Sequence, residues 1–390
     1  MAETTGASGA IRGVPGPDHL VAGRYRLTSK IGGGGMGAVW LARDERLERD
    51  VAAKQVISTE GLTQEEADEL RRRALHEGRL AARLQHRNAV AMYDVALDRG
   101  EPWLVMEYLP SRSLAQVLHM TGSMPERQVA QIGAQMADAL VEAHEAGIIH
   151  RDIKPGNILI ANRGRASGTV KLSDFGIARA KGDDAGPTGI ITGTPAYFAP
   201  EVARGTEPSE ASDLYSLGAT LYTALEGAPP FGVDEDSIAL LHKVALGQIN
   251  PPKNDGPLVR VILDMLQPSP KRRPSLIEAR DRLAAVAAGG GNPAAILAAP
   301  LQATEGAPAV WLRRTAGERT PGDRTSSART TASGPIERKR PIPPAPRPST
   351  YVPPPVAPPS KMSNTVLAAW IIGGFIVLAA IIAGIIIALG

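Results

Sequence analysis

A run of glycines near the start of the chain, "GGGGMGAV" at residues 32–39, restricts the fold more than any other stretch. Without a Cβ atom, these residues let backbone N–H groups come close to phosphate oxygens. A dinucleotide-binding turn needs a helix directly after such glycines, but the "AVWLAR" that follows has the pattern of a strand. The run therefore favours a β-hairpin over phosphates, although the motif alone also fits a flexible loop.

Apolar periodicity divides the region after this run into a strand-rich part and a helical part. Alternating or β-branched segments at 25–31, 37–43, 50–57 and 103–109 predict strands. Helical periodicity is found at 64–84, 125–146, 212–226, 236–246, 258–266 and 275–287. We therefore expect an α+β fold in which a small β-rich lobe leads into a larger helical lobe.

Segments without periodicity flank this region. Residues 1–23 are rich in glycine and proline and lack the basic and apolar regions of a signal peptide, so we expect a disordered leader. From residue 289 the sequence is dominated by Pro, Thr, Ser, Ala and Arg, and 289–365 is predicted to be a disordered linker. The folded domain is thus expected at 24–288.

Charge and cysteine content exclude some classes of function. The net charge is +3, yet residues 289–365 alone hold ten Lys or Arg against four Asp or Glu, so the rest of the chain is slightly acidic. A nucleic-acid-binding domain would show the reverse, and we expect no nucleic-acid partner. The chain has no cysteine, which excludes disulfides and thiolate metal sites.

The run "HRDIKPGNIL" at 150–159 places catalytic residue types in one loop. Asp152 can accept the proton of an incoming hydroxyl, and Lys154 can neutralise a phosphoryl group in transfer. Asn157 can hold a metal, and Asp174 in the following "SDFG" offers a second oxygen ligand of the kind Mg²⁺ prefers. Both runs occurring in this order after the glycine-rich hairpin indicate a phosphoryl-transfer site rather than a chance match.

Lys54 in "VAAK" follows the glycine-rich segment at a distance from which it can reach a nucleotide phosphate. A lone strand lysine is usually a solvated surface charge, and Glu77 by itself would read as an exposed helix charge. A lysine that binds phosphates needs an anionic partner to hold it in place, and Glu77 on the helix predicted at 64–84 could supply one.

These stretches, "GGGGMGAVW", "VAAK", "HRDIKPGN", "DFG" and "APE", resemble the eukaryotic-like (Hanks-type) serine/threonine protein kinases. "RYRLTSKIGGGGMGAVWLARD" and "GTPAYFAPE" are similar to membrane-bound bacterial members, particularly those of actinobacteria. The resemblance covers about 25–288. It implies a bilobal protein kinase fold with an N-lobe at about 24–107 and a C-lobe at about 108–288. Ala53, where a bulkier residue is usual, is a mild departure.

The resemblance implies roles for the matching positions. Lys54 would bind the ATP phosphates and pair with Glu77. Asp152 would be the catalytic base, assisted by Lys154, while Asn157 and Asp174 would hold Mg²⁺ or Mn²⁺. The positions expected to surround ATP are Ile31, Gly32, Gly33, Gly34, Gly35, Met36, Gly37, Val39, Ala52, Lys54, Met106, Glu107, Leu109 and Leu159. Within this set, Val39, Ala52 and Leu159 would sandwich the adenine, Met106 would be the gatekeeper, and 107–109 would form the hinge.

The same resemblance assigns supporting and regulatory roles. Glu201 of "APE" would pair with Arg273, and Asp213 would brace the catalytic loop. Lys154 and Thr194 occupy positions typical of kinases for Ser or Thr, with Thr194 ordering the catalytic loop. Arg151 would pair with a phosphate on the activation segment, for which Thr188 is the first candidate and Thr192 the second.

Other function classes are less compatible with these motifs. No catalytic position is substituted, which argues against an inactive pseudokinase. A nucleotide-binding scaffold would be distinguished by its lack of phosphate transfer. Small-molecule phosphotransferases share the catalytic loop but usually lack both the glycine-rich motif and "APE". A dinucleotide oxidoreductase is excluded by "HRDIKPGN" and "DFG".

The last apolar stretch, 366–389, is uncharged and long enough for a transmembrane helix. Basic residues lie on its N-terminal side, which places that side in the cytoplasm by the positive-inside rule. We therefore expect a single-pass C-terminal anchor in the cell membrane with a cytoplasmic kinase domain and protein substrates. A stripe of small residues would allow a homodimer; it comprises Ala369, Gly373, Ala380, Gly384 and Ala388.

Overall fold

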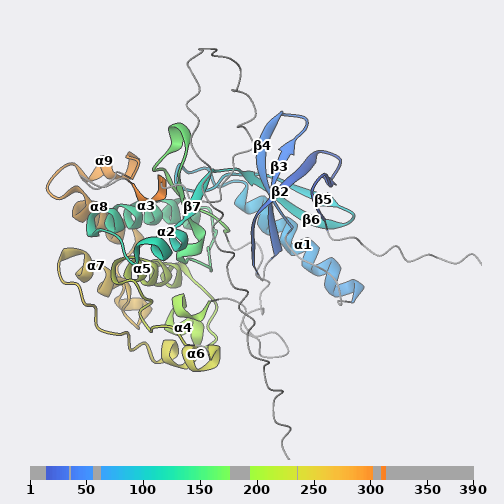
Figure 1. Ribbon diagram of the computed structural model, residues 1–390. Helices are drawn as coiled ribbons and strands as arrows, with labels where there is room; N and C mark the ends of the chain where they lie inside the picture. The colour runs from blue at the N-terminus through green and yellow to red at the C-terminus, as the bar shows by residue number, and fades with distance from the viewer. Residues whose placement is uncertain are drawn as a thin grey trace, which may run out of the picture. The chain divides into compact units, whose positions relative to one another are not determined.

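The computed structural model describes residues 15–34, 37–55, 63–175, 194–234, 236–301 and 309–312. An antiparallel sheet with one long helix forms the first part, and helices form most of the second (Figure 1). The strands are β1 (Leu20–Val21), β2 (Tyr25–Gly34), β3 (Gly37–Asp44), β4 (Arg49–Gln55), β5 (Met92–Asp98), β6 (Glu101–Glu107), β7 (Ser111–Ser113), β8 (Ile158–Ala161) and β9 (Val170–Leu172). The α-helices are α1 (Gln64–Ala81), α2 (Leu114–Thr121), α3 (Glu126–Glu145), α4 (Pro200–Ala203), α5 (Glu210–Glu226), α6 (Ser237–Leu246), α7 (Pro257–Met265), α8 (Leu276–Ala288) and α9 (Pro293–Ala298). Short 3-10 helices occur at η1 (Pro155–Asn157), η2 (Gly164–Ala166), η4 (Pro195–Tyr197), η5 (Pro270–Arg272) and η6 (Val310–Leu312).

Six strands in the order β1-β2-β3-β4-β6-β5 make the sheet of the N-lobe. Alternate side chains of β4 and β6 are buried on opposite faces of the sheet, because successive side chains of a strand point to opposite sides. Ala53 and Val105 belong to the core on one face, with Trp40 and Trp103. Ala52, Leu104 and Met106 pack on the other face with residues of α1. This second face is the one that α1 covers.

Helix α1 lies close to the sheet because a glycine stands at the contact. A Cβ at Gly78 would come within 2.6 Å of Val95 Cγ2. The small buried side chains Ala74 and Ala81 continue the same contact surface. The position of α1 thus rests on a narrow strip of small residues, and Glu77 lies beside this strip.

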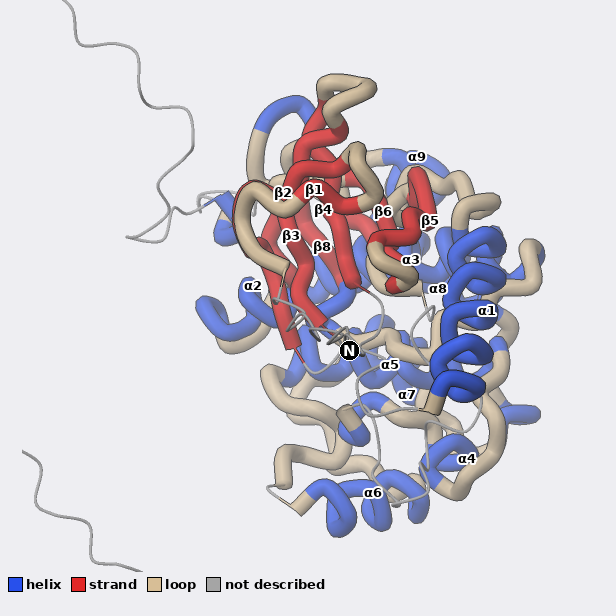
Figure 2. Tube along the Cα trace, turned by 90° about the vertical axis from the view of Figure 1, so that its right-hand side faces the viewer, coloured by secondary structure: helices blue, strands red, loops and turns tan. Residues whose placement is uncertain are grey.

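Helix α3 is the central helix of the C-lobe, and α5, α8 and α9 pack around it (Figure 2). A glycine again permits the approach, because a Cβ at Gly133 would come within 2.6 Å of Leu221 Cδ1. The six helices expected from periodicity are all present, with ends displaced by a few residues. The short helices α2, α4 and α9 were not expected.

The folded chain continues past residue 288, which corrects the expectation that disorder begins at 289. Gly289 ends α8 in the left-handed conformation (φ 56°), and α9 follows after Asn292 caps it. Leu301 and Trp311 are then buried in the C-lobe core. Single apolar residues of this kind form no periodic pattern, and for that reason the sequence did not reveal them.

Two buried glutamines of α3 hold this extension through its backbone. Gln135 Nε2 donates to the carbonyls of Ile296 (2.9 Å) and Ala299 (2.7 Å). Gln131 Nε2 donates to Ala299 O at 3.0 Å. Hydrogen bonds to the main chain fix the segment whatever its side chains are. Leu301 N also donates to Gly168 O at 2.8 Å, in the turn between β8 and β9.

The predicted transmembrane stretch 366–389 and the rest of the predicted linker lie outside the described residues. Within the part of the chain that the structure describes, no helix is both long and apolar enough to cross a membrane.

Candidate active site

The glycine-rich segment forms a β-hairpin, as its sequence favours. Gly32 pairs with Val39, Gly33 with Ala38 and Gly34 with Gly37 across β2 and β3. Gly35 and Met36, at the tip, lie outside the described residues. No helix follows the glycines, so the dinucleotide-binding alternative does not apply.

The residues expected around the adenine share one face of the sheet. Val39 is opposite Lys54 in β3–β4, and Ala52 is opposite Met106 in β4–β6. Because side chains two positions apart in a strand point the same way, all four lie on the face that α1 also covers. From the C-lobe, Leu159 is partly exposed between the buried Ile158 and Ile160, so it points away from the C-lobe core. These positions fit the expected adenine site.

Glu107 has a structural task that the sequence did not indicate. Its Oε2 accepts hydrogen bonds from Ala91 N (3.2 Å) and Lys171 Nζ (2.9 Å). Its backbone N–H is also occupied, since it donates to Ala91 O at 2.8 Å, so the group of Glu107 left for adenine recognition is its carbonyl. At the end of the expected hinge, the carbonyl of Leu109 accepts a hydrogen bond from the Ser111 hydroxyl (2.8 Å).

The ion pairs of the site differ from the expected ones. Lys54 Nζ lies 2.6 Å from Asp174 Oδ1, so this contact joins the N-lobe strand to the segment after β9. Glu77 Oε1 instead lies 3.5 Å from Arg151 Nη1. The predicted pair between Lys54 and Glu77 is therefore not formed in this structure. The physical reason is that each partner is engaged by another charge of opposite sign.

The catalytic loop brings three predicted residues together. Lys154 Nζ lies 2.9 Å from Asp152 Oδ2. Asn157 Nδ2 donates to the same oxygen at 3.1 Å and to the Asp152 carbonyl at 2.7 Å. These contacts fix the Asp152 carboxylate at the opening of the loop and place a cation beside it.

Asp213 holds this loop from below, as the resemblance implies. The side chain is buried on α5, and its two oxygens accept the backbone N–H groups of His150 (2.7 Å) and Arg151 (2.9 Å). His144 Nε2 contacts the same carboxylate at 2.9 Å. Arg151 has a positive φ of 67°, a conformation that costs free energy for a non-glycine residue. Asp213 stabilises that conformation through the Arg151 amide.

His150 is a functional residue whose role the sequence did not reveal. Complete burial lowers the pKa of its imidazole, so the ring is neutral near pH 7. Its Nδ1 accepts from Asp152 N (3.3 Å), which assigns the ring proton to Nε2, and Nε2 donates to Ser173 O (3.0 Å). Its ring also packs on Phe175 with centroids 4.8 Å apart. One neutral ring thus links the catalytic loop to the residues flanking Asp174.

The donor set at Asn157 and Asp174 fits a magnesium ion shared with nucleotide phosphates. Asn157 uses its amide nitrogen on Asp152, which leaves its Oδ1 as the atom that would bind a metal. Asp174 supplies carboxylate oxygens, one of which now contacts Lys54. Across the described ranges, no group of three or more His, Asp or Glu side chains could hold a metal alone. Mg²⁺ commonly takes one or two protein oxygens plus substrate phosphates, which matches this set.

Glu201 and Arg273 form the expected pair in the C-lobe. Both guanidinium Nη atoms contact the two carboxylate oxygens at 2.7 Å. Arg273 also donates to the carbonyls of Gln267 and Ala211, each at 2.8 Å, and lies over the ring of Tyr215. The pair therefore joins the short helix after the activation segment to α5 and to the chain before α8.

Replacing Arg273 by alanine should lower the free energy of unfolding by roughly 3 kcal/mol, because the Glu201 carboxylate, only 12% exposed, would lose its fully buried partner. Arg282→Ala is the matched control: it removes an ion pair with Asp264 of similar length (2.6 Å) whose side chains are exposed. That change should cost less than about 1 kcal/mol. Urea denaturation of both variants measures the difference, and equal losses would contradict this role for Arg273.

Thr194 does not have the predicted contact. Its side chain is exposed at the start of η4, and among the described residues no hydrogen bond links its hydroxyl to Asp152 or Lys154. Lys154 and Asn157 already occupy the Asp152 carboxylate, so the expected ordering by Thr194 is not formed. Thr188 and Thr192, the predicted phosphorylation positions, lie outside the described residues.

Comparisons with known proteins agree with this geometry. The protein kinase domain model matches residues 25–283. The serine/threonine-protein kinase PknB of Mycobacterium leprae is 42% identical over 233 residues, 58% of this chain and 36% of that protein. PknB of Mycobacterium tuberculosis is 41% identical over 234 residues, with the same shares covered. The kinase pkn3 of Myxococcus xanthus is 35% identical over 272 residues, 66% of this chain and 49% of that protein. The chain thus matches between about a third and a half of these relatives' length.

Proposed function

This chain belongs to the protein kinase family, with bacterial serine/threonine kinases among its relatives, and from that premise we propose that it transfers the γ-phosphoryl group of ATP to serine or threonine hydroxyls of proteins. The observation that supports this best is the proximity of two pairs, Lys54 with Asp174 and Asp152 with Asn157. Ser173, next to Asp174, joins them, because its N–H donates to the Asn157 carbonyl at 2.9 Å. A scaffold that only bound nucleotide would have no need of the fixed Asp152 and Lys154 pair.

The proposed reaction assigns each side chain one step. ATP with Mg²⁺ supplies the phosphoryl group and neutralises its charge. Asp152 accepts the proton of the attacking hydroxyl while the new bond from that oxygen to phosphorus forms and the bond to the β-phosphate oxygen breaks. Lys154, already 2.9 Å from Asp152, stabilises the negative charge of the group in transfer. Lys54 leaves Asp174 to hold the nucleotide phosphates, and Asp174 then becomes available as a metal ligand.

Incubation of the full chain with γ-labelled ATP and a protein acceptor tests the proposal. We expect label in the acceptor with Mg²⁺ present and none after chelation by EDTA. Binding of ATP without any transfer, under conditions that keep the chain folded, would instead support a nucleotide-binding scaffold.

The two observed ion pairs suggest how activity is controlled, and we propose that they exchange partners. Arg151 contacts Glu77 in this structure, and Lys54 contacts Asp174. A phosphate on the activation segment would compete for Arg151 because it carries nearly two negative charges. Glu77 would then be released toward Lys54, and Asp174 toward the metal. This exchange accounts for an inactive arrangement without any substituted catalytic residue.

Changing Thr188 to alanine should lower activity after preincubation with ATP, because the phosphate that competes for Arg151 would be missing. We expect a smaller effect from Thr192→Ala, the second candidate. Phosphate transfer measured before and after preincubation separates activation from catalysis. Full activation of the Thr188→Ala chain would contradict the assignment.

We further propose that residues 366–389 anchor the chain in the cell membrane with the kinase domain in the cytoplasm. The support is the uncharged apolar sequence and the basic residues before it. Protease treatment of sealed inside-out vesicles should then digest the kinase domain, whereas right-side-out vesicles should protect it. A proposed homodimer through the small residues of this stretch is tested by comparing the activity of the full chain with that of a chain ending after Arg319, at equal concentration in lipid. Arg319 is the last residue of the first structural unit.

A further inference from the structure

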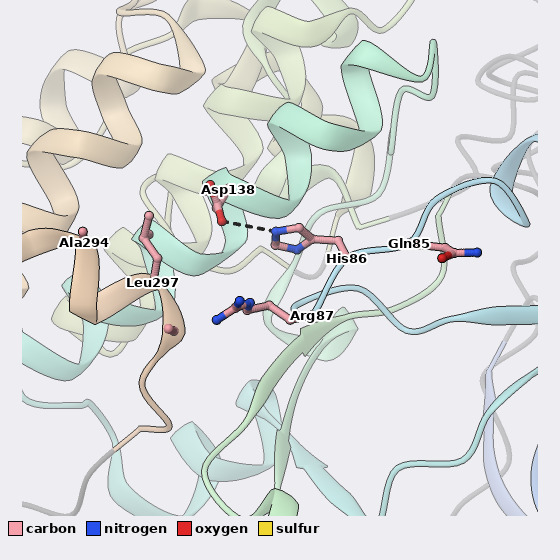
Figure 3. Close-up of a pocket in the computed structure, with 7 residues that line it drawn as sticks. Gln85, His86, Arg87, Asp138, Ala294 and Leu297 are labelled. Carbon is pink, nitrogen blue, oxygen red and sulfur yellow. Dashed lines mark hydrogen bonds and ion pairs between the residues drawn. The ribbon is translucent and has the colours of Figure 1, made fainter.

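An open cavity of about 530 Å³ lies between the loop after α1, helix α3 and helix α9 (Figure 3). None of its lining residues belongs to the active site described above. The lining residues are Gln85, His86, Arg87, Asp138, Ala294, Leu297 and Ala298. The cavity therefore lies between the loop that follows α1, the helix of Glu77, and helix α9, which lies beyond the residues matched by the protein kinase domain model.

The acid in this cavity is already neutralised. His86 Nε2 lies 3.2 Å from Asp138 Oδ2, and Arg280 Nη1 lies 3.2 Å from Asp138 Oδ1. The hydrogen bond from His86 contributes most to holding the pKa of Asp138 below its ordinary value, so the group stays a carboxylate. Asp138 consequently offers no charge to attract a cationic ligand.

Arg87 lines the cavity and has no acidic partner in the part of the chain that the structure describes. Figure 3 shows its side chain reaching toward α9, past the His86–Asp138 pair. Over the described ranges, no acidic side chain lies within ion-pair distance of Arg87, or of Arg83 and Arg79 before it in the chain. All three are exposed, and they fall within nine residues that contain no Asp or Glu. This short stretch thus carries three exposed arginines without an acidic partner among the described residues, and Arg87 at its end lines the cavity.

The opposite wall is apolar and comes from α9. Ala294, Leu297 and Ala298 line it, and the small alanines leave room beside the half-buried Leu297. A guanidinium facing an aliphatic wall suits a ligand that carries a carboxylate next to an apolar side chain. A flat bilayer surface cannot place an apolar group in a concave cavity, and a nucleic-acid backbone offers no aliphatic group for this wall.

We propose that this cavity is a docking site for an acidic, leucine-containing segment of a partner protein. One aliphatic side chain enters against Leu297, an adjacent carboxylate pairs with Arg87, and further acidic residues face Arg83 and Arg79. Charge complementarity supports this occupant, since such pairs guide association and select partners. The site does not depend on the proposed phosphoryl transfer.

Occupation of the cavity would act on α1 through a loop that is already well held. Asn88 Nδ2 donates to Val170 O at 2.7 Å, and Asn88 O accepts from Leu172 N at 2.8 Å. The loop therefore connects the end of α1 to β9, just before Asp174. A partner bound at the cavity would tie this loop to α9 and restrict the movement of α1 and of Glu77.

Binding of a synthetic peptide tests the proposal without any catalytic readout. The probe is a fluorescent peptide of glutamates interspersed with leucines, added to the full chain in detergent micelles, with a lysine-for-glutamate peptide as its control. We expect saturable binding of the acidic peptide only. Hydrogen exchange should slow at residues 85–88 and 294–298 when it binds.

Two variants of the chain locate the binding. Arg87→Glu should weaken it about tenfold or more, because it replaces an attraction by a repulsion. Ala298→Trp should weaken it similarly by filling the cavity at an exposed position. Arg260→Glu, an exposed arginine of α7 with no acidic partner among the described residues, is the matched control and should bind normally. Equal loss in the control, no binding by wild type, or preference for phosphatidylglycerol vesicles over the peptide would overturn the proposal.

Discussion

Replacement of Asp152 by asparagine should lower the rate of phosphoryl transfer roughly a thousandfold, the effect typical of removing a general base. The amide has nearly the same shape as the carboxylate but cannot accept the hydroxyl proton. It also removes the charge that holds Lys154 at 2.9 Å. The measurement is kcat with a serine peptide at saturating ATP.

The control for this change is Asp281→Asn, which alters an exposed aspartate of α8 next to Arg280. It should leave kcat within about twofold, because surface ion pairs contribute little. The melting temperature of the Asp152→Asn chain should stay near that of wild type, so that loss of activity does not reflect unfolding. A variant that keeps more than a tenth of the activity would contradict Asp152 as the base.

Ending the chain after Ala288 should lower the free energy of unfolding by about 5 kcal/mol or more, compared with a chain ending after Arg319. The shorter chain loses the buried Leu301 and Trp311, and it leaves Gln131 and Gln135 without the carbonyls to which they donate. Urea denaturation of the two purified chains measures the difference. Equal stability would show that the extension does not contribute to the fold.

A single substitution separates packing from chain length in this experiment. Trp311→Ala in the chain ending after Arg319 should cost about 3 kcal/mol, since the buried indole leaves a cavity. Leu312→Ala, at the exposed neighbouring position, is the control and should cost well under about 1 kcal/mol. Both variants keep the same length and the same backbone hydrogen-bond partners.

The parts of the site that the sequence predicted well are those set by local chemistry. The glycines at 32–34 pair in a hairpin because the residues after them have strand character. Asp152, Lys154 and Asn157 lie in one short loop, so their meeting follows almost from their spacing. Asp213 and Arg273 are far in sequence from the residues that they contact, so only the family resemblance could name those partners.

The ion pairs of Lys54 and Glu77 could not be predicted in the same way. Lys54 can pair with Asp174 or Glu77, and Glu77 can pair with Lys54 or Arg151, so the sequence is compatible with both arrangements. Residue identity gives the set of partners, but the balance of free energy between the two arrangements decides which pair forms. The contact of Glu77 with Arg151 at 3.5 Å is therefore a property of this conformation.

The end of the folded domain was misplaced because its contacts are long-range. Leu301 and Trp311 are isolated apolar residues in a segment that otherwise has the composition of a linker. One signal was present elsewhere: Gln131 and Gln135 stand four residues apart on a helix whose neighbouring residues are apolar. Buried amides need partners, so this pair indicated that another segment would supply backbone carbonyls to α3.

The most direct test of the central claim offers the wild-type chain a set of peptides that differ only at one acceptor position. The account predicts Mg²⁺-dependent transfer of the γ-phosphoryl group to the serine and threonine peptides, no transfer to the tyrosine or alanine peptides, and loss of transfer in the Asp152→Asn chain. Transfer that persists in the Asp152→Asn chain, or that favours tyrosine, would contradict it.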